Sequence, residues 1–343
     1  MIRITTNGTL YNYKSQLMNS TNKLNDAYNT VLTGRKFNSY DADPAAATQA
    51  FRLRSSLATA DKQSTNNDTV IKKFSTAWDI IGDVLDDLAI DMGKVPALEG
   101  SNDTNLSVLP ELGKVLKSGA EAIVQDMNAK YGDNFIFGGA ETLEVPFVLN
   151  EETGELTYRG QNVNAMNASA YDKINDSLYV DIGLGFQEGA NGEIISSSAY
   201  DSALNGLDFL GYGTEDGTPD GTPNNIISIM WKMGDIFEGY DIDTKTWTNG
   251  TREEAQELMA KLEDATDNLN EQYTKLDADT KYLKTNYDRL TTTKDNLNDQ
   301  IVNIEDVDQA QAIMDLVWAQ QAYNAALKIG TNIIPQSLLD YMN

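Results

Sequence analysis

The sequence contains neither cysteine nor histidine in 343 residues. The two absences remove thiol nucleophiles, zinc sites built from cysteine and histidine, and imidazole general bases. The commonest tools of catalysis are missing, so we expect no enzymatic activity, no bound metal and no cofactor. The lack of disulfides leaves the compartment open, because a reducing cytosol and export of an unfolded chain through a narrow channel both favour a cysteine-free sequence.

Long apolar runs are also missing. No run approaches the roughly 18 residues that identify a membrane span. The first residues, MIRITTNGTLYNYKSQ, lack the apolar core of a cleaved signal peptide. We therefore expect no membrane-spanning segment, and any export has to use a route without signal cleavage.

Positive charge is scarce, since the formal net charge is −26. Residues 131–250 hold 20 acidic side chains against 4 basic ones, whereas residues 1–40 hold five basic and one acidic. Binding of nucleic acid or anionic lipid through the middle of the chain is not expected, because phosphate neutralisation needs clustered cations. With 41% hydrophobic and 23% charged residues, the chain is long and apolar enough for two or three folded domains.

The most regular stretch is a leucine ladder with a seven-residue period. Its rungs are Leu262, Leu269, Leu276, Leu283, Leu290, Leu297 and Ile304. A sustained period of 3.5 residues per turn favours a coiled-coil helix with one narrow apolar face. At about 1.5 Å per residue the ladder is roughly 60 Å long, so another segment has to cover it.

A second apolar stripe offers such a cover. Its residues step by three and four: Ile71, Phe74, Trp78, Ile81, Leu85, Leu88, Met92 and Val95. We predict a helix from Ala45 to about Val95, ended by Pro96, and a further helix from Pro110. The short polar connection between them predicts an antiparallel hairpin.

Helix ends carry local signals. Asp43 and Pro44 have the residue types of an N-cap and a first helical position. Thr251 and Glu254 have the spacing of a capping box at the start of the ladder helix. Gly34 marks the end of an N-terminal helix.

Residues 138–250 change character and are rich in Gly, Asn and Thr. PFVL and ELTY, separated by NEETG, predict a β-hairpin, and SLYVDIGLGF predicts a further strand. The turn-rich residues 216–225 are expected outside any helix. We therefore predict an inserted β-rich domain.

Both ends of the chain carry weaker stripes, which are marginal as isolated helices. We predict that they pair with each other and with neighbouring subunits through Leu10, Leu17, Leu24, Val31, Leu316, Tyr323, Leu327, Ile334 and Leu338. The core of the bundle between them is predicted to contain Ile71, Phe74, Trp78, Ile81, Leu85, Leu88, Leu262, Leu269, Leu276, Leu283, Leu290 and Leu297.

Two acidic pairs, Asp241 with Asp243 and Asp216 with Asp220, have the residue types of glycosidase acids or calcium ligands. Their spacing does not fit an EF-hand loop. Because the whole segment is acidic, we interpret them as solvated loops.

The predicted fold is mainly α with an inserted β-rich domain, in an elongated antiparallel helical bundle or coiled coil built from N- and C-terminal segments. Residues 1–40 and 305–343 are the terminal assembly segments. Residues 41–137 and 251–304 form the helical bundle domain, and residues 138–250 form the outer domain.

Three stretches carry a family resemblance. LTGRKFNSYDADPAAATQAFRLRS near the start, FIFGGAETLEVPF followed by GELTYRG, and AYNAALKIGTNIIPQSLLDYM at the end resemble bacterial flagellins and their relatives. Within that family they are similar to the hook-associated protein 3 branch, the hook-filament junction proteins. The resemblance covers roughly residues 1–160 and 251–343.

The resemblance implies an extracellular, non-enzymatic structural subunit of the bacterial flagellum that joins a hook-associated ring to the filament. It implies export in unfolded form by the flagellar type III apparatus, and terminal helices that pair in an inner tube as a homo-oligomer. Implied partners are a neighbouring hook-associated protein, flagellin, and an export chaperone on the C-terminal segment.

Alternatives are a flagellin proper, which is the filament subunit, or an intracellular coiled-coil scaffold. A glycosidase acting through an acidic pair of the inserted segment is a more remote alternative.

Overall fold

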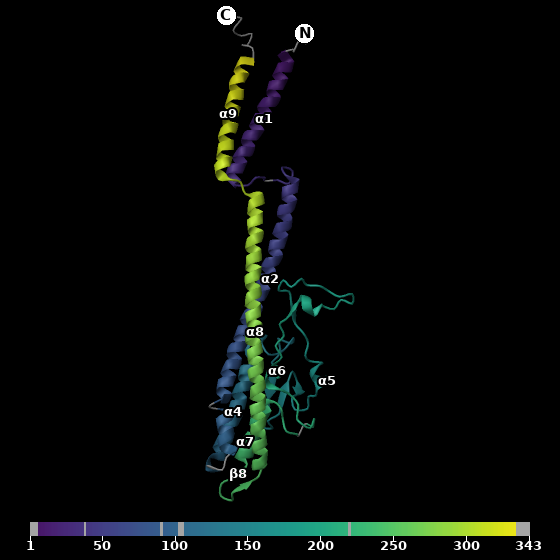
Figure 1. Cartoon of the computed structure of the whole chain (residues 1–343), viewed down its shortest axis with the longest axis vertical. Helices are drawn as coiled ribbons and strands as arrows, with labels where there is room; N and C mark the ends of the chain where they lie inside the picture. Colours follow the sequence, from purple (N-terminus) through teal and green to yellow (C-terminus); the bar gives the residue numbers. More distant parts are fainter. Residues whose placement is uncertain (1–5, 38, 90–91, 102–105, 219–220, 334–343) are drawn as a thin grey trace. The chain divides into compact units, whose positions relative to one another are not determined.

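The computed structural model describes residues 6–37, 39–89, 92–101, 106–218 and 221–333, and most of them are helical (Figure 1). The helices are α1 (Thr6–Thr33), α2 (Pro44–Ala89), α3 (Lys94–Ser101), η1 (Leu106–Val108), α4 (Leu109–Met127), α5 (Ala168–Tyr171), η2 (Ser196–Ser198), α6 (Gly206–Leu210), α7 (Ile226–Glu238), α8 (Arg252–Glu305) and α9 (Gln309–Ile333). The predicted fold class was mainly α with an inserted β-rich domain, and it is confirmed as a mostly helical fold with long helices and a few small sheets. Within the described residues no helix is both long and apolar enough to span a membrane.

The chain divides into two compact units. Unit 1 comprises Met1–Asp61 and Thr291–Asn343, and unit 2 comprises Lys62–Leu290. The residues of the inserted segment belong to unit 2 together with most of α2 and α8, so they do not form a compact unit of their own.

The strands are two or three residues long. They are β1 (Lys130–Tyr131), β2 (Asn134–Phe135), β3 (Phe147–Leu149), β4 (Leu156–Tyr158), β5 (Gln161–Asn162), β6 (Tyr179–Val180), β7 (Tyr200–Asp201), β8 (Tyr240–Asp241) and β9 (Thr246–Trp247). They form antiparallel sheets in the order β1-β2, β3-β4-β5, β6-β7 and β8-β9. The predicted hairpin is β3–β4, in which Val148 pairs with Thr157.

Helix ends follow the local chemistry of the sequence. The Asp43 carboxylate accepts hydrogen bonds from the amides of Ala45 and Ala46 at 3.1 and 2.9 Å. The hydroxyl of Thr251 accepts from the Glu254 amide at 3.1 Å, and the Glu254 carboxylate accepts from the Thr251 amide at 3.0 Å. Both predicted caps are confirmed.

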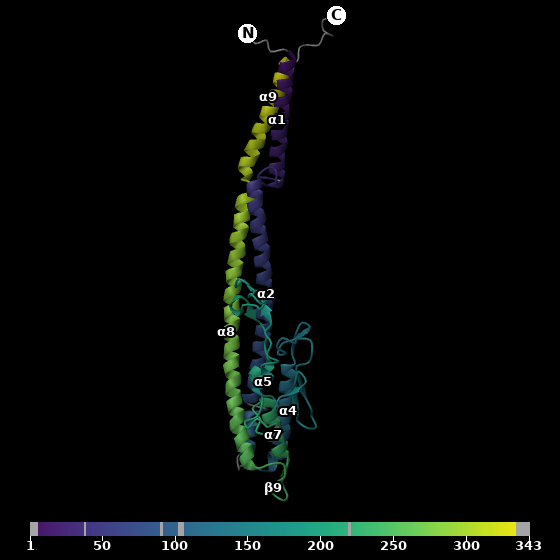
Figure 2. The ribbon, with the colours of Figure 1, turned by 90° about the vertical axis from the view of Figure 1, so that its right-hand side faces the viewer.

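In unit 2, α2 and α8 lie side by side and antiparallel (Figures 1 and 2). The amide nitrogen of Asn67 donates to the Leu283 carbonyl at 2.9 Å, and further along α2 the ring of Tyr273 reaches Gly82. Residue numbers therefore rise along one helix as they fall along the other. Each helix covers the apolar stripe of its neighbour, as two complementary heptad faces require.

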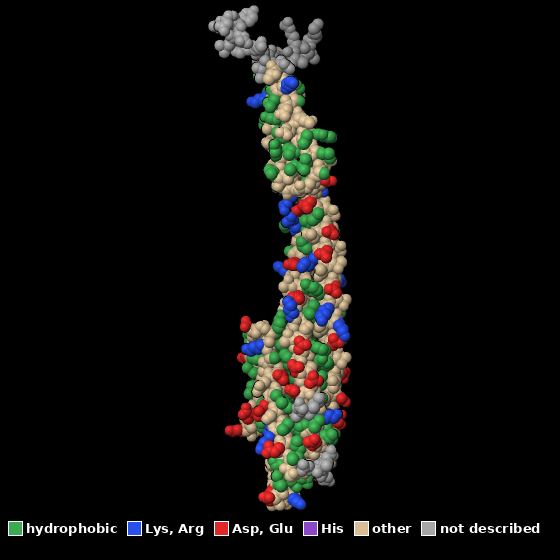
Figure 3. Space-filling view, turned by 90° about the vertical axis from the view of Figure 1, so that its left-hand side faces the viewer, with side chains coloured by type: hydrophobic (Ala, Val, Ile, Leu, Met, Phe, Trp, Pro, Cys, Tyr) green, Lys and Arg blue, Asp and Glu red, His purple; other side chains and the backbone are tan. Residues whose placement is uncertain are grey.

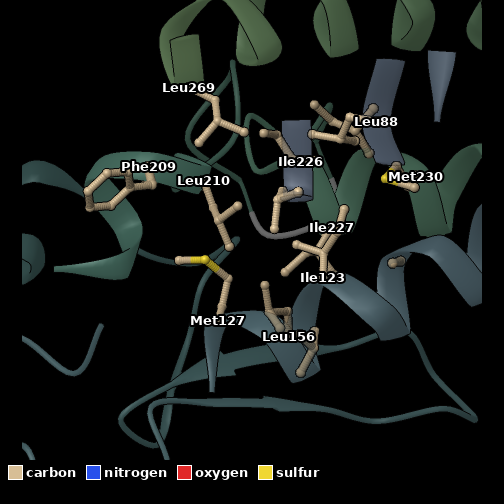
Figure 4. Close-up of a cluster of buried hydrophobic side chains, with 14 of the residues drawn as sticks. Leu88, Ile123, Met127, Leu156, Phe209, Leu210, Ile226, Ile227, Met230 and Leu269 are labelled. Atoms are coloured by element: carbon tan, nitrogen blue, oxygen red, sulfur yellow. The ribbon is translucent and has the colours of Figure 1, made fainter. Parts of the chain in front are cut away.

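One hydrophobic cluster unites the elements of unit 2. Leu88 from α2, Ile123 and Met127 from α4, Ile227 from α7 and Leu269 from α8 lie together in it (Figure 4). Side chains from strands and from α6 join the same cluster. Because these elements share one core, the inserted segment folds onto the bundle instead of standing apart.

Most residues predicted for the bundle core are buried. Buried side chains are Phe74, Ile81, Leu88, Leu262, Leu269, Leu276, Leu283 and Leu290. Half-buried side chains are Ile71, Leu85 and Leu297.

Trp78 does not lie in the core. Its side chain is 36% exposed and stacks on Tyr273, with ring centroids 4.9 Å apart. A ring of this size at the edge of the seam between α2 and α8 packs flat across the surface. The prediction from heptad spacing was therefore wrong at this position.

The segment around Pro96 and the middle of the inserted segment also differ from the prediction. Val95 and Pro96 lie in the first turn of the separate helix α3, where a proline costs no hydrogen bond. In the inserted segment, α7 is a 13-residue helix that packs on α4, although the sequence favoured strands there. Its N-cap is Asn225, whose side chain accepts from the amides of Ile227 and Ser228.

Replacing Leu276 with Asp is expected to unfold unit 2, because Leu276 is 2% exposed in the ladder. Lost burial and an unpaired buried charge together should lower the free energy of unfolding by about 4 kcal/mol or more. Ala278→Asp, which adds the same side chain at an exposed position of α8, is the matched control. Chemical denaturation followed by circular dichroism measures both, and equal stability of the two variants would contradict the assignment.

Candidate assembly interface

The helices α1 and α9 form a pair with almost no charge. Three of the 28 residues of α1 and two of the 25 residues of α9 are charged. They are Lys14, Lys23, Asp26, Asp315 and Lys328. This surface contrasts with the acidic remainder of the chain, so it can approach another protein surface with little electrostatic repulsion.

The face of α9 that meets α1 is built mainly from small residues. The covered positions, which follow each other at intervals of three and four, are Ala312, Leu316, Ala319, Tyr323, Ala326 and Gly330. The covered positions of α1 include Tyr13, Leu17, Ser20, Leu24, Ala27 and Val31. Small residues let the two helix backbones approach closely, while the intervening large side chains interlock.

Gly330 shows why a small residue is needed. A Cβ atom built on Gly330 would overlap the hydroxyl and ring of Tyr13. The tyrosine therefore lies directly over the glycine backbone and fixes the register between the two ends of the chain. A glycine that weakens an isolated helix by roughly 1 kcal/mol here provides the space for this contact.

Apart from Leu316 and Tyr323, the large apolar side chains described on α9 are exposed. Ile313, Met314, Val317, Trp318 and Ile329 are all exposed, and Trp318 reaches 69%. On α1, Tyr11, Met18, Tyr28 and Leu32 are exposed as well. At the upper end of Figure 3, where α1 and α9 lie, hydrophobic side chains gather on the surface with few charges between them.

A groove runs beside this surface. It has a volume of about 460 Å³ and is lined by Ser20, Lys23, Ala27, Asp315, Trp318, Ala319 and Ala322. Both helices contribute to its walls. The groove is open because the side chains between the helices, such as Ala27 and Ala319, are small. A large side chain of another subunit can enter here.

The structure brings the predicted interface residues of the two ends together within unit 1, because α1 and α9 lie side by side (Figure 2). Leu17, Leu24, Val31, Leu316 and Tyr323 are half-buried between them, and Leu10 and Leu327 remain exposed. Ile334 and Leu338 lie outside the described residues. Sequence reasoning missed the outward residues around Trp318, which the scarcity of charge in the same segment could have revealed.

The inner ends of α1 and α9 are held by a short β-bridge. Arg35 and Asp306 face each other, the Lys36 amide donates to the Glu305 carbonyl at 2.6 Å, and the Val307 amide donates to the Gly34 carbonyl at 3.0 Å. Gly34 has φ +68°, a left-handed conformation that glycine adopts without strain.

Beside the bridge, the Arg54 guanidinium holds the Glu305 carboxylate with two hydrogen bonds, one from Nε at 2.8 Å and one from Nη2. The hydrogen bonds from Arg54 lower the pKa of Glu305. The carboxylate is largely buried, whereas the arginine is half-exposed.

In the acidic pairs of the inserted segment, Asp241 has a structural role. The Asp241 carboxylate accepts from the amides of Asp243 and Thr244 and so closes the turn between β8 and β9. Hydrogen bonds from Thr244, then from Asp243, lower the pKa of Asp241. Asp216 lies in a second turn, and Asp220 is outside the described residues. Among the residues that the structure describes, no cluster of three acidic side chains is suited to a metal ion.

Residues 259–342 match the model of the bacterial flagellin C-terminal helical region. The match begins in α8, three residues before the first leucine of the ladder, and includes all of α9. The C-terminal part of the chain is therefore similar to the C-terminal helical region of flagellins. The family resemblance drawn from the end of the sequence is thereby confirmed, and the outward apolar surface of α9 lies within this flagellin region.

Two solved structures share the fold of the chain. One, described as a flagellar hook-associated protein from Vibrio parahaemolyticus, has 17% identity and a TM-score of 0.56, over 77% of this chain and 100% of that one. The other, flagellar hook-associated protein 3 from Legionella pneumophila, has 11% identity and a TM-score of 0.50, over 74% and 98% of the two chains. At these identities the likeness establishes the fold. No curated protein sequence matches the chain.

Replacing Gly330 with Ala is expected to separate α1 from α9, although alanine favours helix by roughly 1 kcal/mol. Hydrogen exchange of the α9 amides should become faster, and Tyr13→Ala in the same chain should restore slow exchange. Gly82→Ala is the matched control, because a Cβ there meets Tyr273 only at 3.4 Å or beyond. Slower exchange in the Gly330 variant would contradict the contact.

The Arg54–Glu305 pair predicts a pH dependence. Since the folded pKa of Glu305 lies below its ordinary value of 4.5, its stabilisation is present above that value and is lost as pH falls through the folded pKa. Protection of the Val307 amide, corrected for intrinsic exchange, should stay constant above about pH 4.5 and fall progressively below it.

Two variants test this dependence. In Glu305→Gln the loss of protection at acid pH should be much smaller. Asp299→Asn, at an exposed position of α8, should behave as the unmodified chain. The same pH profile in both variants would show that Glu305 is not responsible.

Proposed function

We propose that the chain is a structural subunit of the bacterial flagellum that joins a hook-associated ring to the filament. The observation that carries the proposal is the outward apolar face of α1 and α9. It lies on a helix pair with almost no charge and partly within the flagellin C-terminal region. The fold shared with hook-associated proteins supports the position at the junction.

Exposed apolar surface on this scale favours association. Burying one side chain such as Trp318 or Val317 contributes about 1.5–3 kcal/mol, and the described side chains of α9 include six exposed large apolar ones. The charged residues of α1 and α9, three basic and two acidic, nearly cancel. Neighbouring copies can therefore pack through this pair, whereas their acidic segments repel one another and stay apart.

The three-part division of the chain gives each part a role in this proposal. Residues 1–40 and 305–343 make the assembly contacts, residues 41–137 and 251–304 form the supporting bundle, and residues 138–250 face outward. Proposed partners are further copies of the chain, a neighbouring hook-associated protein, flagellin and an export chaperone on the C-terminal segment. The proposed location is extracellular, after export without a cleaved signal, and the proposed role is non-enzymatic.

A filament subunit is the second candidate, because the flagellin region by itself fits both proteins. Electron microscopy of cells that lack the protein distinguishes them. Intact hooks that shed flagellin monomer support the junction role, whereas missing filaments beside normal hook-associated caps support a filament subunit. An intracellular scaffold would be found only in the cytosol of flagellated cells.

Replacing Trp318 with Ser is expected to abolish assembly without unfolding the chain, because its side chain is 69% exposed. Cells carrying this variant should export the protein but release it and flagellin into the medium. Immunoblots of medium and of sheared filaments measure the distribution.

Leu143→Ser is the matched control, since Leu143 is 72% exposed in the inserted segment. It should leave filaments attached. Normal filaments with the Trp318 variant would sink the proposed interface, whereas detachment with both variants would point to a general loss of stability.

A further inference from the structure

Unit 2 contains a small pocket whose walls are mainly apolar. It lies between α2 and the strands β1, β2 and β6, and its volume is about 280 Å³. Val70 from α2, Phe135 from β2, and Leu178 and Val180 beside or in β6 contribute apolar walls. The pocket is close to the lower end of the size range of ligand sites, roughly 300–1,000 Å³, so it suits a small molecule.

Lys73 is the one charged side chain among the lining residues, in a chain with a net charge of −26. Its ammonium group donates a hydrogen bond to the Ser202 carbonyl at 2.8 Å. Within the described part of the chain this is its one polar contact, although an ammonium carries three donors. The half-buried cation therefore lacks the anionic partner that normally accompanies such a group.

The surroundings of Lys73 explain why no carboxylate of the chain fills this role. Asp201 is the acidic residue whose charge acts on Lys73. Its carboxylate, however, already accepts hydrogen bonds from the amides of Leu178 and Ala203. Burial lowers the pKa of Lys73 to about 8, and the charge of Asp201 opposes this shift only in part. The neighbouring Lys72 is exposed and pairs with Asp68 at 2.6 Å.

We propose that this pocket binds a small carboxylate with an apolar body. The carboxylate pairs with Lys73, and the apolar body packs on Val70, Phe135 and Leu178. A single ammonium on an apolar wall matches one negative charge, whereas phosphate groups require several cations or an array of amides. The site is independent of the assembly surface on α1 and α9, and its role goes beyond assembly.

Hexanoate is a suitable probe, with hexan-1-ol as its neutral counterpart of the same length. We expect hexanoate to bind the full-length chain at neutral pH, as measured by saturation-transfer NMR and by titration calorimetry. Hexan-1-ol should bind at least about tenfold more weakly, because it cannot pair with the cation.

Lys73→Met should weaken hexanoate binding by a similar factor of about ten or more. It should keep or raise the melting temperature, because it removes a buried charge without leaving a cavity. Lys72→Met is the matched control, which should bind hexanoate as the unmodified chain does. The side-chain NMR signal of Lys73 should shift on addition of hexanoate.

Three outcomes overturn the proposal. One is no measurable binding of hexanoate to the unmodified chain. Another is equal binding by the Lys73 variant, which would place the probe elsewhere. The third is equal affinity for hexan-1-ol, which would make the pocket a purely apolar site.

Discussion

The seam between α2 and α8 is the contact on which unit 2 depends. Leu269, Leu276 and Leu283 are buried along it, and two asparagines tie other segments to it. Asn67 bonds from α2 to α8, and Asn286 bonds from α8 to the Ile182 carbonyl in the inserted segment. Because two helices cannot cover all sides of an apolar seam, α4, α7 and the inserted segment complete the core.

The two units use apolar side chains in opposite ways. Unit 2 buries large apolar side chains against its own elements. In unit 1, the α9 face that meets α1 carries small residues between Leu316 and Tyr323, and the larger side chains point outward. A monomer rarely leaves such a surface uncovered unless a partner covers it. Large apolar side chains are thus buried in the core of unit 2 and exposed on the helix pair of unit 1.

The helix caps and the pairing of the striped helices were predictable from the sequence, whereas the helix α7 and the exact contact between α1 and α9 were not. Some features depend on neighbouring residues alone. They are the helix caps at Asp43 and Thr251, and the end of α8, which lies one residue after Ile304. The helix α7 was missed although its polar residues recur at intervals of three and four, which is a helical period: Ser228, Lys232, Asp235 and Glu238. The face of α9 that meets α1 depends on the contact between Tyr13 and Gly330, from opposite ends of the chain, which no local pattern contains.

The β-bridge between Gly34–Lys36 and Glu305–Val307 joins the end of α1 to the segment that precedes α9, so both helices extend from the same point. From it, α1 and α9 extend over 28 and 25 residues. Adding one turn to either helix between the bridge and the Tyr13–Gly330 contact would move the two residues apart by about 5.4 Å along the helix axis. The lengths of the two ends are therefore coupled, and an insertion in one terminal segment is tolerated only with a matching insertion in the other.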